Sequence, residues 1–481
     1  MPIQPLQFGQ RSNPNRNDTQ GTLVNCYAEN LGTENEAQWA LYACDGFEAF
    51  STLTGAGVGV VRGWLNLDDT SLITVAGSRI NSVSTLGVAT DLGALSTTGT
   101  AYLARNRKTP NAQVAIVTSD GLFRIVENGV VTTPSVDPDI PTFNSVCGTD
   151  GYLIFTCESG EWFISSIDEG GTIDDLEFAQ ANTNPDNATL GIVRGRDVLI
   201  CGPKSVEAYQ NTGQTDFPFE RVTSIDIGLA YPPAAVNVSA VVDDTTQDTV
   251  IFPANNSDGA YAGVMILAGY QAKKISTPDV DRCIRDETDK SSLRAYTRVD
   301  NGHVMYVLTG STFTREYNCD TGAWCQRKSS GLSVYRCVAG ITFNGQQILA
   351  DCATGTLYRQ SHSLIPASAS TVALRHSNTN GSTWISRSAK AVGTTGQSKV
   401  LRWHALGQSK EDGKVLEFTF SNAIVENSVG TDMVVITPPV HAFPKVMEFN
   451  QILVNVPART SQTASAKGFY NLAADINVLE A

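Results

Sequence analysis

The chain has 481 residues, of which 41% are hydrophobic and 17% charged, a composition typical of a folded globular protein rather than a disordered one. Its 34 Lys and Arg against 48 Asp and Glu give a formal charge of −14, and no cluster of basic residues stands out. Direct binding to nucleic acid is therefore excluded as a leading hypothesis, because it needs clustered cations that displace counterions from the phosphates.

The N-terminus and the apolar windows indicate where the protein is made. Residues 1–9 show no basic segment followed by an apolar core, so we expect no secretory signal. The most apolar window, 261–270, is far too short to span a bilayer, so we expect no membrane insertion. The sequence therefore predicts a soluble protein that is synthesised in the cytoplasm.

Residues 1–50 lack a regular alternation of apolar and polar residues and contain a polar, turn-rich run at 12–17. Two interpretations remain open at this point. The segment is either an arm that packs across or between subunits, or an ordered surface loop of the domain that follows. We treat 1–50 as an N-terminal arm.

From Val58 onward the chain reads as a series of short strands joined by tight turns. The clearest example is the apolar run 198–201, which stops at Gly202-Pro203 before a second extended segment at 205–209. Gly, Pro and Asn supply the backbone angles of tight turns and are poor inside a helix, so this pattern predicts a β-hairpin. Similar hairpins are predicted at 60–75, 113–126, 152–165, 303–317 and 346–359. Asp-Gly or Asn-Gly pairs mark turns at 120–121, 128–129, 150–151, 301–302 and 344–345.

The hairpins form groups about 35 to 45 residues apart, which is the period expected of a β-propeller blade. After the first two groups, they lie near 143–180, 188–225, 233–278, 291–330 and 335–360. We predict an all-β fold with a propeller of six or seven blades over residues 51–362. The last group is thin, so we expect a strand from the N-terminal region to complete it, because closure removes an exposed sheet edge.

The composition changes after Arg359. Residues 361–371 are rich in Ser and Ala and contain a proline, which suits a linker. Beyond it, Leu416, Phe418 and Phe420 alternate with polar residues, the pattern of a half-buried strand. Residues 363–481 are therefore predicted to form a separate, small C-terminal β-sandwich. Its other predicted strands are 372–375, 399–406, 433–436 and 452–456.

No arrangement of residues points to catalysis, a cofactor or a metal. The five histidines, at 303, 362, 376, 404 and 441, are scattered without the spacing of metal ligands. The glycine-rich run 55–59 does not match a nucleotide loop, since G-x-G-x-x-G is absent and no helix follows. The ten cysteines contain no C-x-x-C pair, and we expect buried reduced thiols rather than disulfides or metal ligands. No catalytic, cofactor-binding or metal-binding residue is predicted.

Three adjacent acidic pairs raise the question of a glycosidase, since such enzymes use two carboxylates. The pairs are Asp68-Asp69, Asp174-Asp175 and Asp243-Asp244. Neighbours on a strand point to opposite faces, and nothing around these residues argues for the burial that raises a carboxyl pKa. We expect solvated turn residues. A single hairpin at 377–384 is similar to the Asp-box of sialidases, with Thr379 in place of the aspartate, and is interpreted as structural.

Several short segments occur in an order that is similar to one known family. They are 161–169, 191–213, 324–336 and 380–407, together with the start Met1-Pro-Ile-Gln4. On these segments the chain resembles the packaged-DNA stabilisation proteins, also described as tail accessory or hub (nozzle) proteins, of P22-like short-tailed bacteriophages. The resemblance runs through most of the chain, and its specific part is the order of the segments.

The resemblance implies a virion protein with a propeller core that assembles as a ring of six copies below the head-to-tail adaptor. Such a ring continues the DNA channel, retains the packaged DNA, carries the tail needle or plug, and contributes to docking tailspikes or tail fibres. DNA only passes through the channel, and we expect an acidic or neutral channel wall. The resemblance implies no catalytic residue and no cofactor, and it places the protein in the tail of the virion after synthesis in the host cytoplasm.

Two alternatives of other classes remain. The first is a propeller that binds or cleaves glycans on the host surface, which predicts a deep pocket with converging carboxylates and arginines. The second is a general propeller scaffold for protein partners, which predicts no symmetric ring.

Overall fold

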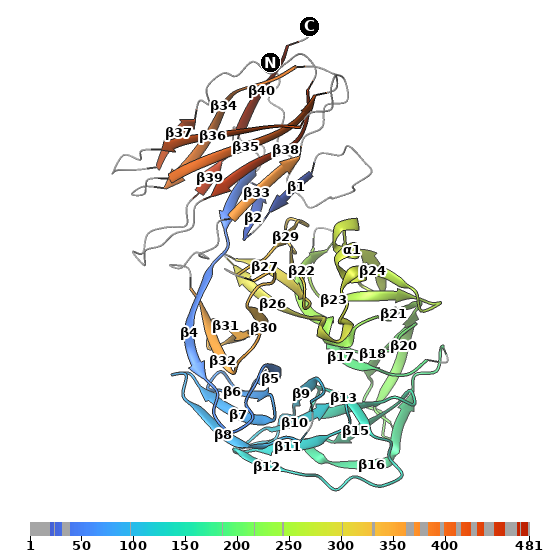
Figure 1. Cartoon of the computed structure of the whole chain (residues 1–481). Helices are drawn as coiled ribbons and strands as arrows, with labels where there is room; N and C mark the ends of the chain where they lie inside the picture. The colour runs from blue at the N-terminus through green and yellow to red at the C-terminus, as the bar shows by residue number, and fades with distance from the viewer. Residues whose placement is uncertain are drawn as a thin grey trace.

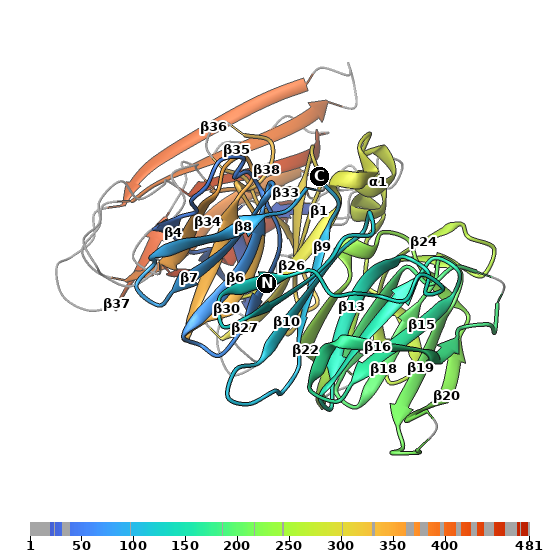
Figure 2. The same ribbon diagram turned by 90° about the horizontal axis from the view of Figure 1, so that it is seen from below.

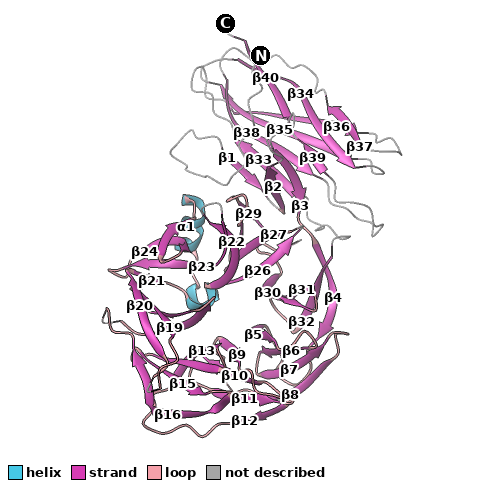
Figure 3. Ribbon diagram, turned by 180° about the vertical axis from the view of Figure 1, so that it is seen from behind, coloured by secondary structure: helices cyan, strands magenta, loops and turns pink. Residues whose placement is uncertain are grey.

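The computed structural model describes most of residues 20–361 and the strands of the C-terminal region. The described ranges are 20–23, 25–30, 39–96, 98–184, 186–215, 217–242, 245–300, 302–329, 332–361, 370–375, 383–394, 399–409, 415–424, 431–436, 447–456, 469–471 and 473–479. Strands dominate them, and the all-β prediction is confirmed (Figures 1 and 3).

The middle of the chain folds into a β-propeller of seven blades arranged around a central axis (Figure 1). Each blade is an antiparallel sheet, numbered here in chain order. Blade 1 contains β5 (Val61–Asn66), β6 (Ser71–Ala76), β7 (Arg79–Ser84) and β8 (Ala89–Ala94). Blade 2 contains β9 (Ala101–Arg105), β10 (Gln113–Thr118), β11 (Phe123–Glu127) and β12 (Val130–Thr132). Blade 3 contains β13 (Phe143–Thr149), β14 (Tyr152–Cys157), β15 (Glu161–Ser166) and β16 (Glu169–Gln180). Blade 4 contains β17 (Leu190–Arg194), β18 (Asp197–Cys201), β19 (Val206–Asn211) and β20 (Phe219–Ile225).

The remaining blades vary this plan. Blade 5 contains β21 (Ile227–Leu229), β22 (Val236–Val242), β23 (Thr245–Asn256), β24 (Tyr261–Ala268) and β25 (Gln271–Lys274). Blade 6 contains β26 (Arg294–Asp300), β27 (His303–Thr309), β28 (Thr314–Asn318) and β29 (Trp324–Gln326). Blade 7 contains β30 (Cys337–Phe343), β31 (Gln346–Asp351), β32 (Thr356–Ser361) and β4 (Gly46–Thr52). The count of six or seven blades expected from the sequence therefore resolves to seven.

Blade 7 is completed by a strand from the beginning of the chain. Strand β4 pairs antiparallel with β32, with Gly46 opposite Ser361 and Thr52 opposite Thr356. This is the N-terminal closing strand that the thin last group of hairpins predicted. Residue 50, the end of the expected N-terminal arm, lies inside β4, which pairs with a strand far along the chain.

The hydrophobic core is divided among the contacts between neighbouring blades. One cluster of buried apolar side chains lies between each pair of adjacent blades, including the pair formed by blades 7 and 1. Middle strands are therefore covered on both faces, and all residues of β10 and β18 are buried. This explains why their sequences read as continuous apolar runs rather than alternating ones.

The turn signals in the sequence correspond to residues with left-handed backbone angles. Asn128 and Gly129 have φ values of 49° and 76°, and Asn344 and Gly345 have 47° and 69°. Two successive positive φ angles define the type I′ turn, whose twist matches that of a two-residue hairpin. The Asn-Gly hairpin predictions at these two sites are confirmed.

One α-helix, α1 (Pro278–Asp286), lies in the described residues, between β25 and β26. Thr277 caps it by accepting a hydrogen bond from the Val280 backbone amide, and Pro278 follows at the first helical position. Val280 and Ile284 are buried in the cluster between blades 5 and 6. Figure 2 shows α1 at the rim of the propeller. No helix in the described ranges is long and apolar enough to cross a membrane.

The C-terminal strands form three sheets, two of which include strands from the N-terminal region. One sheet has the order β1-β33-β38-β35-β36, a second has β37-β34-β40, and a third has β2-β3-β39. The strands are β1 (Gln20–Leu23), β2 (Cys26–Asn30), β3 (Trp39–Ala43), β33 (Ser370–Arg375), β34 (Thr383–Thr394), β35 (Lys399–Ser409), β36 (Val415–Ile424), β37 (Thr431–Ile436), β38 (Met447–Val456), β39 (Phe469–Asn471) and β40 (Ala473–Leu479). Each strand predicted beyond residue 371 falls within one of these. The division into arm, propeller and sandwich domains stays a prediction.

Candidate functional site

The acidic pairs singled out in the sequence have three different outcomes. Asp68 lies in the turn between β5 and β6, where its carboxylate accepts hydrogen bonds from the Thr70 and Ser71 backbone amides, both at 3.0 Å. Partial burial acts to raise the pKa of Asp68, but these hydrogen bonds outweigh it and lower the pKa. The turn prediction is thus confirmed for this pair. Asp243 and Asp244 lie outside the described residues.

For Asp174 and Asp175 the turn prediction is wrong, because both belong to β16, the outermost strand of blade 3. Phe178 of β16 lies opposite Phe163 of β15, and the next pair in the register is Ile173 with Ser165. Four residues of β16 therefore oppose a single residue of β15, so 174–177 bulge away from the sheet. This bulge is what exposes the acidic pair.

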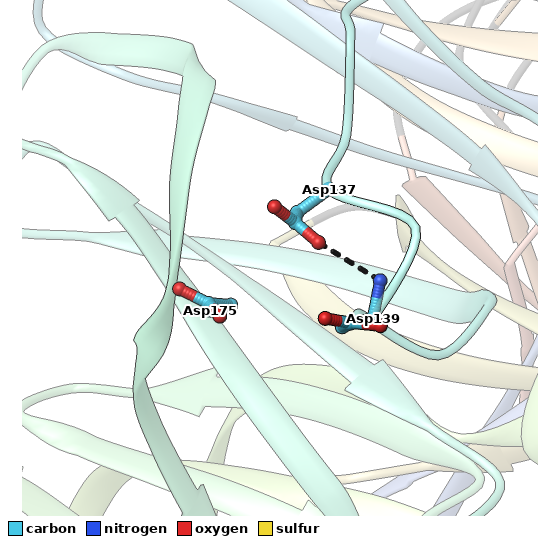
Figure 4. Close-up of side chains that lie close together, drawn as sticks. All are labelled: Asp137, Asp139 and Asp175. Atoms are coloured by element: carbon cyan, nitrogen blue, oxygen red, sulfur yellow. Dashed lines mark hydrogen bonds between the residues drawn. The ribbon is translucent and has the colours of Figure 1, made fainter.

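Asp175 meets two further carboxylates, Asp137 and Asp139, from the connection between blades 2 and 3 (Figure 4). One carboxylate oxygen from each lies within 4.8 Å of those of the other two, and the Asp139 amide donates a 2.9 Å hydrogen bond to Asp137 Oδ1. Desolvation and the charges of Asp137 and Asp174 raise the pKa of Asp175. These are oxygen donors of the kind that Ca²⁺ prefers, but all three side chains are exposed, and the cluster alone defines no metal site.

A cleft of about 580 Å³ opens next to this cluster, between blade 2 and the beginning of β16. Gln113 lines the cleft and makes two hydrogen bonds there. Its Nε2 donates to Glu127 Oε2 at 2.8 Å, and its Oε1 accepts from the Gly170 amide at 2.7 Å. Lys108 Nζ bridges the two blades, at 3.2 Å from both Glu127 and Glu169. The cleft is lined by Asn111, Gln113, Ile125, Glu127, Asn128, Val130, Thr132, Pro134, Glu169, Gly171 and Thr172.

Hydrogen bonds in the cleft favour the ionised form of Glu127. The hydrogen bond from Gln113, and then that from Lys108, lower the pKa of Glu127. Hydrogen bonds to Glu127 and Glu169 raise the pKa of Lys108. A general acid of a glycosidase needs a raised carboxyl pKa, so this cleft has the opposite electrostatic character.

A second site lies where the N-terminal segment meets blades 6 and 7. We call it the buried clasp, and it consists of Asp45, Arg298, Asp300, Glu316 and Arg327, each at most 2% exposed. Arg298 Nη1 donates to Asp300 Oδ2 at 3.0 Å, and its Nη2 donates to Glu316 Oε1. Arg327 Nη2 donates to the Asp45 carbonyl at 3.3 Å, and the Asp45 amide donates to Asp300 Oδ2 at 3.2 Å.

The charged side chains of the buried clasp interact with one another. Burial acts to lower the pKa of Arg298, but the charges of Glu316 and Asp300 raise it well above its ordinary value. The Arg327 guanidinium lies 4.4 Å from the centre of the Tyr335 ring, a cation–π contact between blades 6 and 7. Because charged groups so deeply buried are stable only when paired, the clasp ties residue 45 to the two blades it touches.

Asn25 continues this attachment along the outer edge of blade 6. Its backbone amide donates to the Gln326 carbonyl at 2.8 Å. Its side chain donates to the Lys328 carbonyl and accepts from the Lys328 amide, both at 2.9 Å, as a neighbouring strand would do. Asn25 adopts a φ of 55°, which Asn tolerates better than most residues.

The other residues noted in the sequence take structural positions. His303 contacts Asp320 at 2.8 Å and packs edge-on against Tyr27. His404 lies in β35, and His362, His376 and His441 lie outside the described residues. Nine cysteines are described with their side chains, and all nine are free thiols. Most of the Asp-box-like hairpin lies outside the described residues, with Thr383 opening β34.

Sequence reasoning missed both the clasp and the cleft. The sequence contained one signal for the clasp. Arg298 and Asp300 are two residues apart in β26, so both charged side chains lie on the same face of the strand. Charged residues inside a strand that is otherwise half-buried suggest internal ion pairs, but their partners come from residues far along the chain.

The seven blades and the closing strand β4 place the protein in the class of β-propellers. The chain matches the model of the family described as "Bacteriophage P22 Gp10, beta-propeller" over residues 3–363, and it belongs to this family. It is therefore a phage structural protein of the stabilisation type, a component of the virion. The family resemblance stated from the sequence is confirmed.

Several solved structures match the chain at low sequence identity. The WD40 β-propeller domain of Doa1 is 15% identical, with 66% of this chain and 96% of that chain covered and a TM-score of 0.38. The computationally designed Ika8 protein is 11% identical, with 74% and 99% covered and a TM-score of 0.39. A catalytically inactive virginiamycin B lyase from Staphylococcus aureus, with quinupristin, is 11% identical, with 66% and 99% covered and a TM-score of 0.45. No curated protein matches the chain in sequence.

Proposed function

We propose that the protein is a hub, or nozzle, of a phage tail, which assembles as a ring of six copies below the head-to-tail adaptor. The ring continues the DNA channel, retains the packaged DNA, and docks the tail needle or plug and the tailspikes or fibres. The protein acts by shape and repeated contact and carries no enzymatic activity. The observation that carries this proposal is the family match, which spans the whole propeller.

The architecture supports a role under mechanical load. Each blade packs on its neighbours through its own apolar cluster, and β4 closes the ring between the two ends of the propeller. Because β4 joins the beginning of the propeller to its last blade by strand pairing, the unit resists being opened between blades 7 and 1. A symmetric assembly then repeats every contact between copies, so that weak interfaces add up.

The charge of the chain supports passage of DNA without adhesion. A formal charge of −14 repels phosphates, and an acidic or neutral channel wall lets the genome slide. A ring whose lumen is strongly basic would contradict this part of the proposal.

The glycan alternative rests on one observation, the cleft between blades 2 and 3 with two carboxylates. The lowered pKa of Glu127 argues against hydrolysis there, but binding of a polar ligand is compatible with the lining. The isolated protein should leave bacterial polysaccharide uncut, measured as the release of reducing ends.

The test of the main proposal is electron microscopy of the purified protein over a concentration series. Symmetric rings with an open axial channel support the tail hub and give the number of copies. Single propellers at all concentrations, both alone and with the adaptor of the same phage, contradict it.

A further inference from the structure

The negative charge of the protein is concentrated in one part of the propeller. Residues 109–193, which span most of blade 2, all of blade 3 and the beginning of β17, contain thirteen Asp and Glu but only one basic residue, Arg124. Lys108, just before this range, pairs with Glu127 and Glu169 and leaves the other carboxylates of the range in excess. The rest of the chain is close to neutral. Such an asymmetry creates a local negative potential, which attracts a cationic partner at distances up to about 8 Å at physiological salt.

Within this part of the chain, β16 presents an unpaired sheet edge. It is the outermost strand of blade 3, and no other described strand pairs with its free side. In Figure 2, which views the molecule from below, β16 faces the viewer. An exposed strand edge is a template for an extended segment, because its backbone amides and carbonyls are available for pairing.

Exposed apolar side chains accompany this edge. Leu176, at the tip of the bulge, is 81% exposed, and Phe178 is 42% exposed although it stacks on Phe163 at 5.5 Å. A leucine so exposed between two acidic neighbours, Asp175 and Glu177, gains nothing from the fold of its own chain. It is placed to contact another segment.

The cleft and the carboxylate cluster extend the same surface. Gly171 and Thr172 of β16 and Pro134 line the cleft, and Asp137 and Asp175 follow within a few residues. We call this continuous surface the acidic edge. It consists of Glu127, Asp137, Asp139, Glu169, Asp174, Asp175, Leu176 and Phe178.

The acidic edge fits an extended segment that carries basic side chains beside apolar ones. Residues 1–19 of the chain have this chemistry: the apolar residues Leu6 and Phe8 stand at alternate positions, Arg11 and Arg16 follow, and Asp18 is the single acid. These residues precede β1, which pairs with β33, whereas β16 lies at the other end of the molecule (Figures 1 and 3). A neighbouring copy is therefore better placed to supply the segment.

We propose that the acidic edge of one copy binds the N-terminal residues 1–19 of a second copy. The inference rests on the ring assembly proposed above and names the surface and the segment that join its members. The contact is heterologous, since one copy gives the segment and the other the edge, and such contacts close into rings when the rotation permits.

The test uses charge exchange in the full-length chain. We expect the edge variant Asp174→Lys/Asp175→Lys and the segment variant Arg11→Glu/Arg16→Glu each to raise the concentration for half-maximal assembly about tenfold. The combined variant should restore assembly, because the opposite charges meet again. Leu176→Ser should weaken assembly as well, whereas Leu86→Ser, which changes a side chain that is 87% exposed on blade 1, and Asp248→Asn should not.

The outcomes separate this inference from the proposed function. Rings that form normally in both charge variants overturn the inference and leave the tail-hub proposal standing. Assembly that is lost in both variants but not restored in the combined variant also overturns it, since another segment then occupies the edge. If the wild-type chain forms no ring, either alone or with the adaptor of its own phage, the tail-hub proposal fails. A labelled peptide of residues 1–19 then decides the inference: binding that Asp175→Lys weakens about tenfold supports it, and no binding overturns it.

Discussion

Arg359 Nε donates a 3.0 Å hydrogen bond to Glu48 Oε1, and the two residues are separated by 311 positions in the sequence. The contact joins β32 to β4, the strand that closes the propeller. Both side chains are about two-fifths exposed, so this ion pair contributes little by itself. It marks the junction between β4 and β32, which we call the seam. The seam is stabilised by the pairing of the two strands and by the side chains packed beneath them.

The first prediction concerns this seam. The ring of Phe47 lies 4.7 Å from that of Tyr358 and 5.9 Å from that of Tyr335, in the cluster between blades 6 and 7. Phe47→Ala should lower the free energy of unfolding by about 2–3 kcal/mol, because it removes a partly buried aromatic side chain. Urea denaturation followed by tryptophan fluorescence measures the change. Leu86→Ala, at an exposed position, should stay within about 0.5 kcal/mol of the wild type.

The buried clasp gives the second prediction. Arg298→Met leaves Asp300 and Glu316 buried without their main partner, and it should destabilise the protein by about 3–5 kcal/mol. The matched control is Arg285→Met, which removes an ion pair to Asp286 between two exposed side chains and should cost less than about 1 kcal/mol. Equal losses in the two variants would show that the clasp is not a coupled unit.

The inner strands give the third prediction. A Cβ atom on Gly63 of β5 would lie 2.0 Å from the Ala101 carbonyl oxygen of β9, so neighbouring inner strands approach too closely for a side chain. Gly63→Ala should therefore lower stability by about 1–3 kcal/mol, since the backbone of one blade must shift. Gly171→Ala is the control, because its Cβ would meet nothing closer than 3.7 Å. Thermal unfolding of the two variants side by side measures the difference.

Acid should weaken the contact between the end of α1 and blade 6. Burial acts to raise the pKa of Glu287, but hydrogen bonds from Ser311 and Thr312 lower it to about 2, from a usual value of 4.5. A carboxyl whose folded pKa is depressed stabilises the fold above its unfolded pKa and loses that contribution as the pH falls. The stability difference between wild type and Glu287→Gln should thus shrink between pH 4.5 and about 2. A constant difference over this range would contradict the assignment, and Asp286→Asn serves as the exposed control.

The sequence revealed those parts of the fold that depend on neighbouring residues. Asn128-Gly129 and Asn344-Gly345 predicted their turns because only a few residue types adopt two successive positive φ angles without strain. The run 198–201 predicted β18 because a strand covered on both faces must be apolar throughout. The need for a closing strand followed from the cost of an open sheet edge, although its partner in β4 could not be read from the sequence.

Features that depend on distant pairing stayed hidden. The bulge that exposes Asp174 and Asp175 arises from the register between β16 and β15, and nothing local in 169–180 shows it. The clasp joins Asp45 to Arg327, which are separated by 282 positions. Burial of these charges is decided by which strands become neighbours, so their residue types alone suggest an exposed surface.

The most direct test of the central claim is electron microscopy of the protein mixed with the head-to-tail adaptor of its own phage. The account predicts a ring of propellers seated on the adaptor, coaxial with its channel and present in six copies. Propellers that remain single and leave the adaptor bare, at concentrations well above those in an infected cell, would contradict it.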